Sequence, residues 1–516
     1  MKLRLPNNIT ILGENNQAIK DNRDVIIENK IENETLSISI TADTTPLCFI
    51  KFEWFLSNNE QHDFNSIKVL GDAWERGYGD LEWQRIDDDR CMPWYCIVSN
   101  GSDSIQNYDN RFTECFGVKV RPSAFCYWKY TSNVLTLVLD IRNGSKGVLL
   151  HGRTLSVAEV IFADYKAISA YSAVSNFCNI LCTSAVLPKF PVFGFNDWYF
   201  SYGNSDKEMI LNSTRMLTER CDEYANTPYM VIDDGWQINF NDGPWHLANP
   251  RFGDMSSVAK NIADMGVHPG IWIRPLQQKA ESHDIPDSWR LSHNKEALDP
   301  SNSEVLKYIS DCLTRIVGWG FKLIKYDFVT YDIFLKWGFE CSDSLIYGDW
   351  QFQDTSRTTA EIILGLYKTI RQAAGDTILI GCNTISHLCA GLVELNRTGD
   401  DTSGKEWERT LKMGVNTLAF RSTHNKAFYI ADADCVGITD DIPFYLNEKW
   451  LYALSVSGSP MFVSMPVATS DAIKQTVHNA LRINSIQTDS LIPLDWMETK
   501  TPSQWLLNGE QIQITW

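Results

Sequence analysis

The feature that most constrains this chain is the apolar run at 321–329, because it contains a lysine and an aspartate, Lys325 and Asp327. A short apolar run of this kind is typical of a buried parallel strand. Side chains two residues apart on a strand point to the same side, so the two charges would lie together. Burying charge is costly unless the groups are paired or used. The run therefore holds a structural ion pair, ends in solvent, or forms part of a functional site.

Other apolar runs between about residues 190 and 470 end in the same way. Polar, charged or aromatic residues follow seven such runs in succession: Asn196, Asp197 and Trp198; Asp233, Asp234 and Trp236; Trp272 and Arg274; Lys325 and Asp327; Cys382 and Asn383; Arg397, Asp400 and Asp401; Asp432 and Asp434. In a barrel of parallel strands, the active site lies at the C-terminal strand ends, where such residues collect.

The segments between these runs have helical spacing of apolar residues. Ser205 with Glu208 and Ser301 with Glu304 predict capping boxes for two helices, and further helices are expected over 255–265 and 358–374. Eight strand candidates alternating with helices predict a (β/α)8 TIM barrel. A doubly wound open sheet is the competing interpretation, but no glycine-rich phosphate loop follows any of the runs.

The barrel is expected over 188–470, after a cluster of prolines that marks its start. Residues 1–187 contain short β-rich runs, such as 35–41 and 134–140, separated by Asn, Asp and Gly, which predict an antiparallel β-sandwich domain. Residues 471–516 begin as a helix and end in runs such as 504–507, so we expect a small C-terminal β segment, whose completeness the sequence leaves open.

Composition excludes several classes of partner. The net charge of −18 and the pI near 5.0 argue against nucleic acid or an anionic membrane as a binding partner. With 516 residues, the chain is too long to fold around a single hydrophobic core. The 13 cysteines lack zinc-ligand spacing, and no run is long enough to span a membrane. We expect a cytoplasmic protein, or an exported one whose signal peptide has been removed. The oligomeric state stays open.

Carboxylates on opposite sides of a barrel mouth suit the cleavage of glycosides. One carboxylate attacks the anomeric carbon or activates water, and the other gives its proton to the leaving oxygen. Adjacent acids suit hydrogen bonding to sugar hydroxyls. The same acids could hold Mg²⁺ or Mn²⁺, but Lys325, Arg274 and Arg397 lie among them and the nine histidines do not cluster. No metal or other cofactor is therefore expected.

Six motifs in order resemble glycoside hydrolase family 36 and its clan relatives in families 27 and 31. They are Asn196-Asp-Trp-Tyr-Phe200, Ile232-Asp-Asp-Gly-Trp236, Phe252-Gly-Asp-Met255, Gly270-Ile-Trp-Ile-Arg-Pro275, Lys325-Tyr-Asp327 and Arg397-Thr-Gly-Asp400-Asp401. The resemblance covers about residues 190 to 440. It implies an exo-acting, retaining enzyme similar to α-galactosidases, acting on an α-galactoside oligosaccharide or glycoconjugate.

The resemblance also implies roles for individual residues. Asp327 takes the place of the nucleophile and Asp400 that of the acid/base, and both should open into one pocket. The remaining residues are expected to bind substrate: Asp233, Asp234 and Lys325 through sugar hydroxyls, Trp198 and Trp236 as apolar walls, Cys382 and Arg397 at the floor, and Arg274 and Asp401 beside them.

Two departures from the family pattern keep alternatives open. Asp401 stands where the family has Asn, so the acid/base could be either Asp400 or Asp401. Gly381-Cys-Asn-Thr-Ile385 replaces the usual glycine-rich motif, which leaves the sugar open. The alternatives are a transglycosidase of the raffinose-synthase type, an α-N-acetylgalactosaminidase and a catalytically silent carbohydrate-binding protein.

Overall fold

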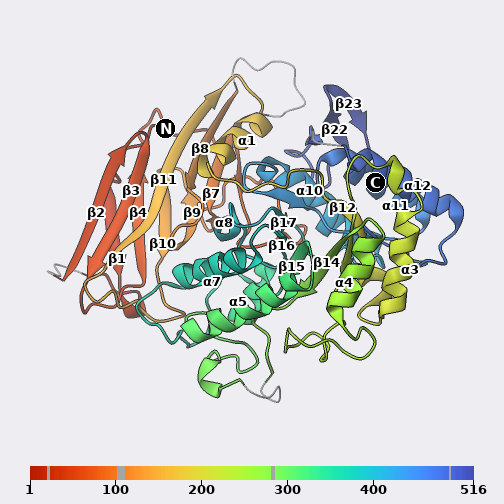
Figure 1. The fold of residues 1–516 in the computed structure, drawn as a ribbon. Coiled ribbons are helices and arrows are strands. Elements are labelled where there is room, and N and C mark those ends of the chain that lie inside the picture. Colours follow the sequence, from red (N-terminus) through yellow and green to blue (C-terminus); the bar gives the residue numbers. More distant parts are fainter. Residues whose placement is uncertain (20–23, 102–110, 280–284, 487–489) are drawn as a thin grey trace.

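The computed structural model describes residues 1–19, 24–101, 111–279, 285–486 and 490–516. An antiparallel β-sandwich forms the N-terminal part, a parallel sheet flanked by helices follows, and a small antiparallel sheet lies near the C-terminus (Figure 1). The fold class predicted from the sequence is thereby confirmed.

The sandwich consists of a five-stranded and a six-stranded sheet. The first has the order β1 (Asn8–Leu12), β4 (Phe49–Phe55), β10 (Val134–Asp140), β9 (Phe125–Tyr130) and β6 (Met92–Pro93). The second has the order β2 (Val25–Glu32), β3 (Thr35–Ala42), β11 (Thr154–Lys166), β8 (Phe112–Val118), β7 (Tyr95–Ser99) and β5 (Lys68–Gly71). Alternate residues of β4 point inward, and Trp54 meets Trp128 and Phe162 in the core between the sheets.

The sheet that follows the sandwich has nine strands, and all its paired strands run parallel. Its order is β18 (Ile430–Asp432), β17 (Leu395–Arg397), β16 (Ile378–Gly381), β15 (Leu323–Tyr326), β14 (His268–Ile273), β13 (Tyr229–Ile232), β12 (Phe193–Asn196), β20 (Met461–Ser464) and β19 (Val436–Gly437). The edge strands β18 and β19 are separated by only three residues of chain. Its two edges are therefore close together in space, so the sheet curves around as in a barrel.

Most of the α-helices in the described ranges follow these strands, and the first of them precedes β12. They are α1 (Ala170–Leu181), α2 (Trp198–Ser201), α3 (Lys207–Thr218), α4 (Met255–Asp264), α5 (Ser303–Gly318), α6 (Val329–Phe334), α7 (Thr359–Ala374), α8 (Ser386–Cys389), α9 (Trp407–Arg409), α10 (Asn416–Arg421), α11 (Phe444–Ser457) and α12 (Asp471–Asn484). In Figure 1, α5 and α7 lie side by side beneath the sandwich, and α3 and α4 cover the opposite side of the barrel. None of the helices in the described ranges is long and apolar enough to cross a membrane.

Two predicted helix caps differ from the structure in detail. Asp206, not Ser205, caps α3, because the Ser205 hydroxyl donates to Asp197 instead. Asn302, not Ser301, caps α5, because the Ser301 hydroxyl accepts from the amide of Asp354. Strand β12 ends at Asn196, whose side-chain oxygen accepts from the Trp198 amide as α2 begins.

The C-terminal part divides between the barrel and the small sheet. Helix α12 follows β20 and contacts β12 and β20, so it covers the barrel. Strands β21 (Ile492–Pro493), β22 (Gln504–Leu507) and β23 (Glu510–Gln513) form the antiparallel sheet beyond it.

Candidate active site

A cavity of about 400 Å³ lies at the C-terminal ends of the barrel strands. Its lining includes seven of the eleven residues for which the sequence predicted a catalytic or substrate-binding role: Trp198, Asp233, Asp234, Lys325, Asp327, Asp400 and Asp401. These residues follow β12, β13, β15 and β17 or lie at their ends. Because parallel strands bring their carboxyl ends to one edge, four separate chain segments deliver their polar groups to one hollow.

Asp327 directly follows β15 and is held on both carboxylate oxygens. Its Oδ1 accepts from the Phe328 amide at 2.7 Å, and its Oδ2 accepts from the Trp272 indole at 3.2 Å. Phe328 adopts φ 62°, a left-handed conformation that is uncommon for a bulky residue. The chain thus turns sharply after Asp327, and two hydrogen bonds fix the carboxylate in the cavity lining.

Lys325 and Asp233 form a buried ion pair beside Asp327. The Lys325 ammonium donates to Asp233 Oδ2 at 2.8 Å, and the same oxygen accepts from Asn196 at 2.8 Å. Burial alone would lower the pKa of Lys325, but Asp233 and other nearby anions outweigh it and hold that pKa well above its ordinary value. Lys325 is therefore a permanent cation in the cavity wall.

Asp234 and Asp197 have raised pKa values. Burial raises the pKa of Asp234 to about 6, although Gln237 and the Asn241 amide donate to its carboxylate. Burial likewise raises the pKa of Asp197 to about 6. Asp197 accepts from the Asp233 amide at 2.7 Å, so it supports the loop after β13 from behind the cavity.

Asp400 is bound by two arginines from different parts of the chain. Arg76 contacts its Oδ1 at 2.7 Å and Arg409 its Oδ2 at 2.8 Å. Arg76 comes from the connection between β5 and β6 of the sandwich, so the cavity is shared by the two parts of the molecule. Asp401 contacts Arg397 at 2.8 Å; burial opposes its ionisation, but Arg397 and other cations outweigh it and lower its pKa.

Four residues predicted to bind substrate lie outside the lining of this cavity. Trp236 is fully buried and its indole donates to the Trp272 carbonyl, so its ring forms no exposed wall. Arg274 is paired with Asp332 beneath the ring of Phe328. Arg397 lies between Asp401 and Asp434, and Cys382 is buried next to it. These residues support the lining from below.

Sequence reasoning missed several lining residues. They are Arg76, Phe240, Asn241, Phe328, Trp337 and Arg409. Trp272 also lines the cavity; the sequence places it at a strand end but predicts no role for it. Phe328 directly follows Asp327 and could have been found from that strand end. Arg76 belongs to the sandwich and gives no local signal of its role.

Across the described ranges, no three His, Cys, Asp or Glu side chains are grouped so that they could hold a metal ion.

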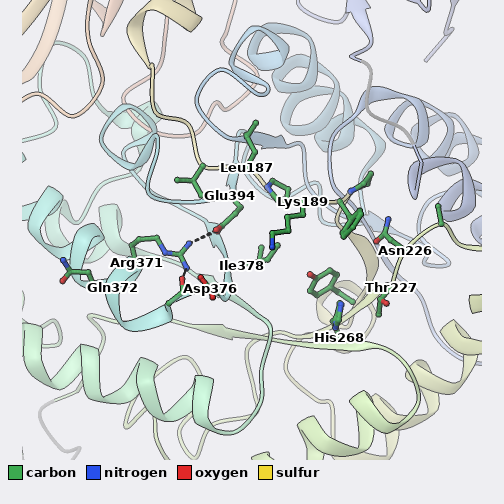
Figure 2. Close-up of a pocket in the computed structure, with 17 residues that line it drawn as sticks. Leu187, Lys189, Asn226, Thr227, His268, Arg371, Gln372, Asp376, Ile378 and Glu394 are labelled. Carbon is green, nitrogen blue, oxygen red and sulfur yellow. Dashed lines mark hydrogen bonds and ion pairs between the residues drawn. The ribbon is translucent and has the colours of Figure 1, made fainter.

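A larger hollow of about 1000 Å³ lies at the opposite end of the barrel, beside Tyr229, His268 and Ile378 at the starts of β13, β14 and β16. Figure 2 shows its side chains, with Arg371 and Glu394 joined across the wall. The Glu394 carboxylate also accepts from the Leu379 amide, so this pair holds neighbouring strands together. The acids predicted to be catalytic line the other cavity instead.

No protein-family model matches the chain. Solved structures share its fold. An α-galactosidase from Thermus thermophilus in complex with p-nitrophenyl α-D-galactopyranoside has a TM-score of 0.59 at 15% identity, over 99% of this chain and 98% of that one. A variant GH36 α-galactosidase from Geobacillus stearothermophilus in complex with raffinose has a TM-score of 0.62 at 13% identity, over 97% of this chain and 79% of that one. At these identities the likeness establishes the fold.

Proposed function

We propose that this protein is a retaining, exo-acting α-glycoside hydrolase and that its substrates are α-galactosides. The observation that carries the proposal is the meeting of Asp327 and Asp400 in the lining of one cavity with Asp233, Asp234 and Lys325. Glycoside hydrolases typically cleave their substrates with two carboxylates that face one small cavity. The cavity has the size of a small-molecule site.

In the proposed mechanism, Asp327 is the nucleophile. Its carboxylate attacks the anomeric carbon and forms a glycosyl-aspartate ester while the bond to the leaving oxygen breaks. Asp400 gives its proton to that oxygen, then takes a proton from the water that hydrolyses the ester. Two displacements restore the original anomeric configuration. Arg76 and Arg409 stabilise the carboxylate that Asp400 becomes after it has donated its proton.

The other lining residues suit a sugar ring. Asp233, Asp234 and Lys325 offer charged hydrogen-bonding groups to hydroxyls, which makes each such bond stronger than a neutral one. Trp198, Trp272 and Trp337 supply aromatic surface for the apolar face of the ring. The two structural neighbours with bound p-nitrophenyl α-D-galactopyranoside and raffinose support galactose as the sugar.

A screen of p-nitrophenyl α- and β-glycosides tests the proposal. We expect release of nitrophenol from the α-galactoside, with the α-anomer of galactose as the first product seen by NMR. Asp327→Asn should abolish turnover, because no carboxylate remains to form the ester. No hydrolysis of any α-glycoside by the intact protein, or first formation of the β-anomer, would refute the proposal.

Azide distinguishes the two candidates for the acid/base. In Asp400→Gly, azide should restore turnover of p-nitrophenyl galactoside, because a small nucleophile can attack the glycosyl ester without help from a general base. Asp401→Gly should show no such rescue, since the proposed acid/base, Asp400, is still present in that variant. Rescue of the Asp401 variant alone would move the role to Asp401.

A further inference from the structure

Glu75 is a buried carboxylate that the proposed mechanism does not use. It lies next to Arg76 in the connection from β5 to β6, and it is fully buried yet outside the cavity lining. Its Oε1 accepts from the Gly338 amide at 2.7 Å and from the Tyr78 hydroxyl, and its Oε2 accepts from the Asn383 side chain. One carboxylate thus ties the sandwich to two loops of the barrel.

A second anchor holds the same segment. Arg421, the last residue of α10, contacts Asp72 Oδ1 at 2.7 Å and donates to the Glu75 carbonyl at 2.5 Å. Asp72 and Arg421 are both almost completely buried. The backbone from Asp72 to Glu75 is therefore fixed to the barrel from one side while the Glu75 carboxylate fixes it from the other.

The segment leads directly to the proposed acid/base. Beyond Arg76, the Gly77 amide donates to the Thr398 carbonyl at 2.7 Å, and the Asp400 amide donates to the Gly77 carbonyl at 3.1 Å. Tyr78 closes the loop, because its hydroxyl donates to Glu75 and accepts from Arg76 Nε at 3.3 Å. Asp400 thus receives both a backbone bond and a guanidinium from a segment that Glu75 holds.

We propose that Glu75 is a positioning residue, which acts through Tyr78 and Arg76 to hold the carboxyl group of Asp400 where it protonates the leaving oxygen. The proposal rests on the proposed function. Under this proposal, a residue of the sandwich domain helps to position the group that protonates the leaving oxygen.

The dependence of rate on the leaving group separates this role from simple structural support. Methanol is a poor leaving group and needs its oxygen protonated as the bond breaks, whereas nitrophenolate leaves with little help. Displacing Asp400 should therefore slow cleavage of methyl α-D-galactopyranoside far more than that of the p-nitrophenyl glycoside. A general loss of order would slow both alike.

The experiment compares kcat/KM for these two galactosides in the wild type, Glu75→Gln and Tyr78→Phe. Glu75→Gln should lose about ten times more activity on the methyl than on the p-nitrophenyl substrate, a part of the roughly 10²–10⁴-fold that general acid catalysis supplies. Tyr78 is a half-buried residue and Tyr78→Phe removes only its hydroxyl, so this variant should fold and show the same pattern more weakly. It keeps the test valid if Glu75→Gln does not fold.

Glu361→Gln is the matched control. Glu361 is also a barrel–sandwich link, paired with Arg153 at 2.8 Å, but it lies at the start of α7 and outside the cavity lining. It should leave the ratio of the two rates unchanged. Equal losses on both substrates in the folded variants at Glu75 or Tyr78 would overturn the positioning role alone. Failure of the wild type to cleave either galactoside would instead overturn the proposed function, and the positioning role with it.

Discussion

Replacement of Asp197 by Asn should remove a loss of folding stability that the wild type undergoes as pH rises. Asp197 lies behind the cavity, where its carboxylate accepts from the Asp233 amide and the Ser205 hydroxyl. Burial raises its pKa from 3.8 to about 6. An Asn side chain can keep both contacts, since its oxygen accepts from the amide and its NH₂ group can donate to the serine oxygen.

The sign follows from where the proton is held. As pH rises above about 4, the unfolded chain releases the Asp197 proton first, while the folded protein keeps it until about pH 6. Wild-type stability therefore falls between these values. The pKa difference of about two units corresponds to about 3 kcal/mol, most of which is lost by pH 7. Asp197→Asn removes this loss, so its stability relative to the wild type should rise by about 2–3 kcal/mol from pH 4 to pH 7.

Urea unfolding of both proteins across this pH range measures the effect. Glu60→Gln gives a control of opposite sign, because Arg4 holds the Glu60 carboxylate and lowers its pKa to about 2. In that variant, stability relative to the wild type should fall as pH rises. A difference between wild type and Asp197→Asn that stays constant with pH would refute the reasoning about Asp197.

Three further substitutions test the cavity. Gly399→Ala would place a Cβ 1.9 Å from the Met413 carbonyl oxygen, so we expect a loss of more than about 2 kcal/mol in thermal unfolding, and unchanged stability would contradict the close packing. Lys325→Met leaves Asp233 without its buried cation and should cost about 3–5 kcal/mol in urea unfolding, part of which Asp233→Asn should restore. Trp337→Ala removes an aromatic wall and should raise KM for the nitrophenyl galactoside about tenfold while kcat changes less; an unchanged KM would place the sugar elsewhere.

The sequence by itself determined the architecture and much of the cavity wall. Alternation of apolar runs and helical segments is local information, because strand and helix periods are set by backbone geometry. The residues at and just after the ends of β13, β15 and β17 therefore identified Asp233, Lys325, Asp327 and Asp400 as neighbours. Closure of parallel strands into a barrel was enough to bring them to one mouth.

Only the tertiary structure decided which neighbour takes each polar group. Ser205 and Asp206 are equivalent caps in the sequence, and the position of Asp197 selects Asp206 for the helix. Trp236 follows a strand as Trp198 does, yet the nearby Trp272 carbonyl draws its indole into the core. A hydrogen bond depends on the distance between two atoms, and periodicity does not carry that distance.

The contribution of the sandwich also came from tertiary structure alone. Arg76 lies far from Asp400 in the sequence, in a segment whose pattern predicts only a connection between strands. Packing of the sandwich against the barrel, anchored by Arg421 and Glu75, brings its guanidinium to within 2.7 Å of the Asp400 carboxylate. Spacing along one chain segment fixes the neighbours within that segment, whereas contacts between domains depend on how their surfaces pack.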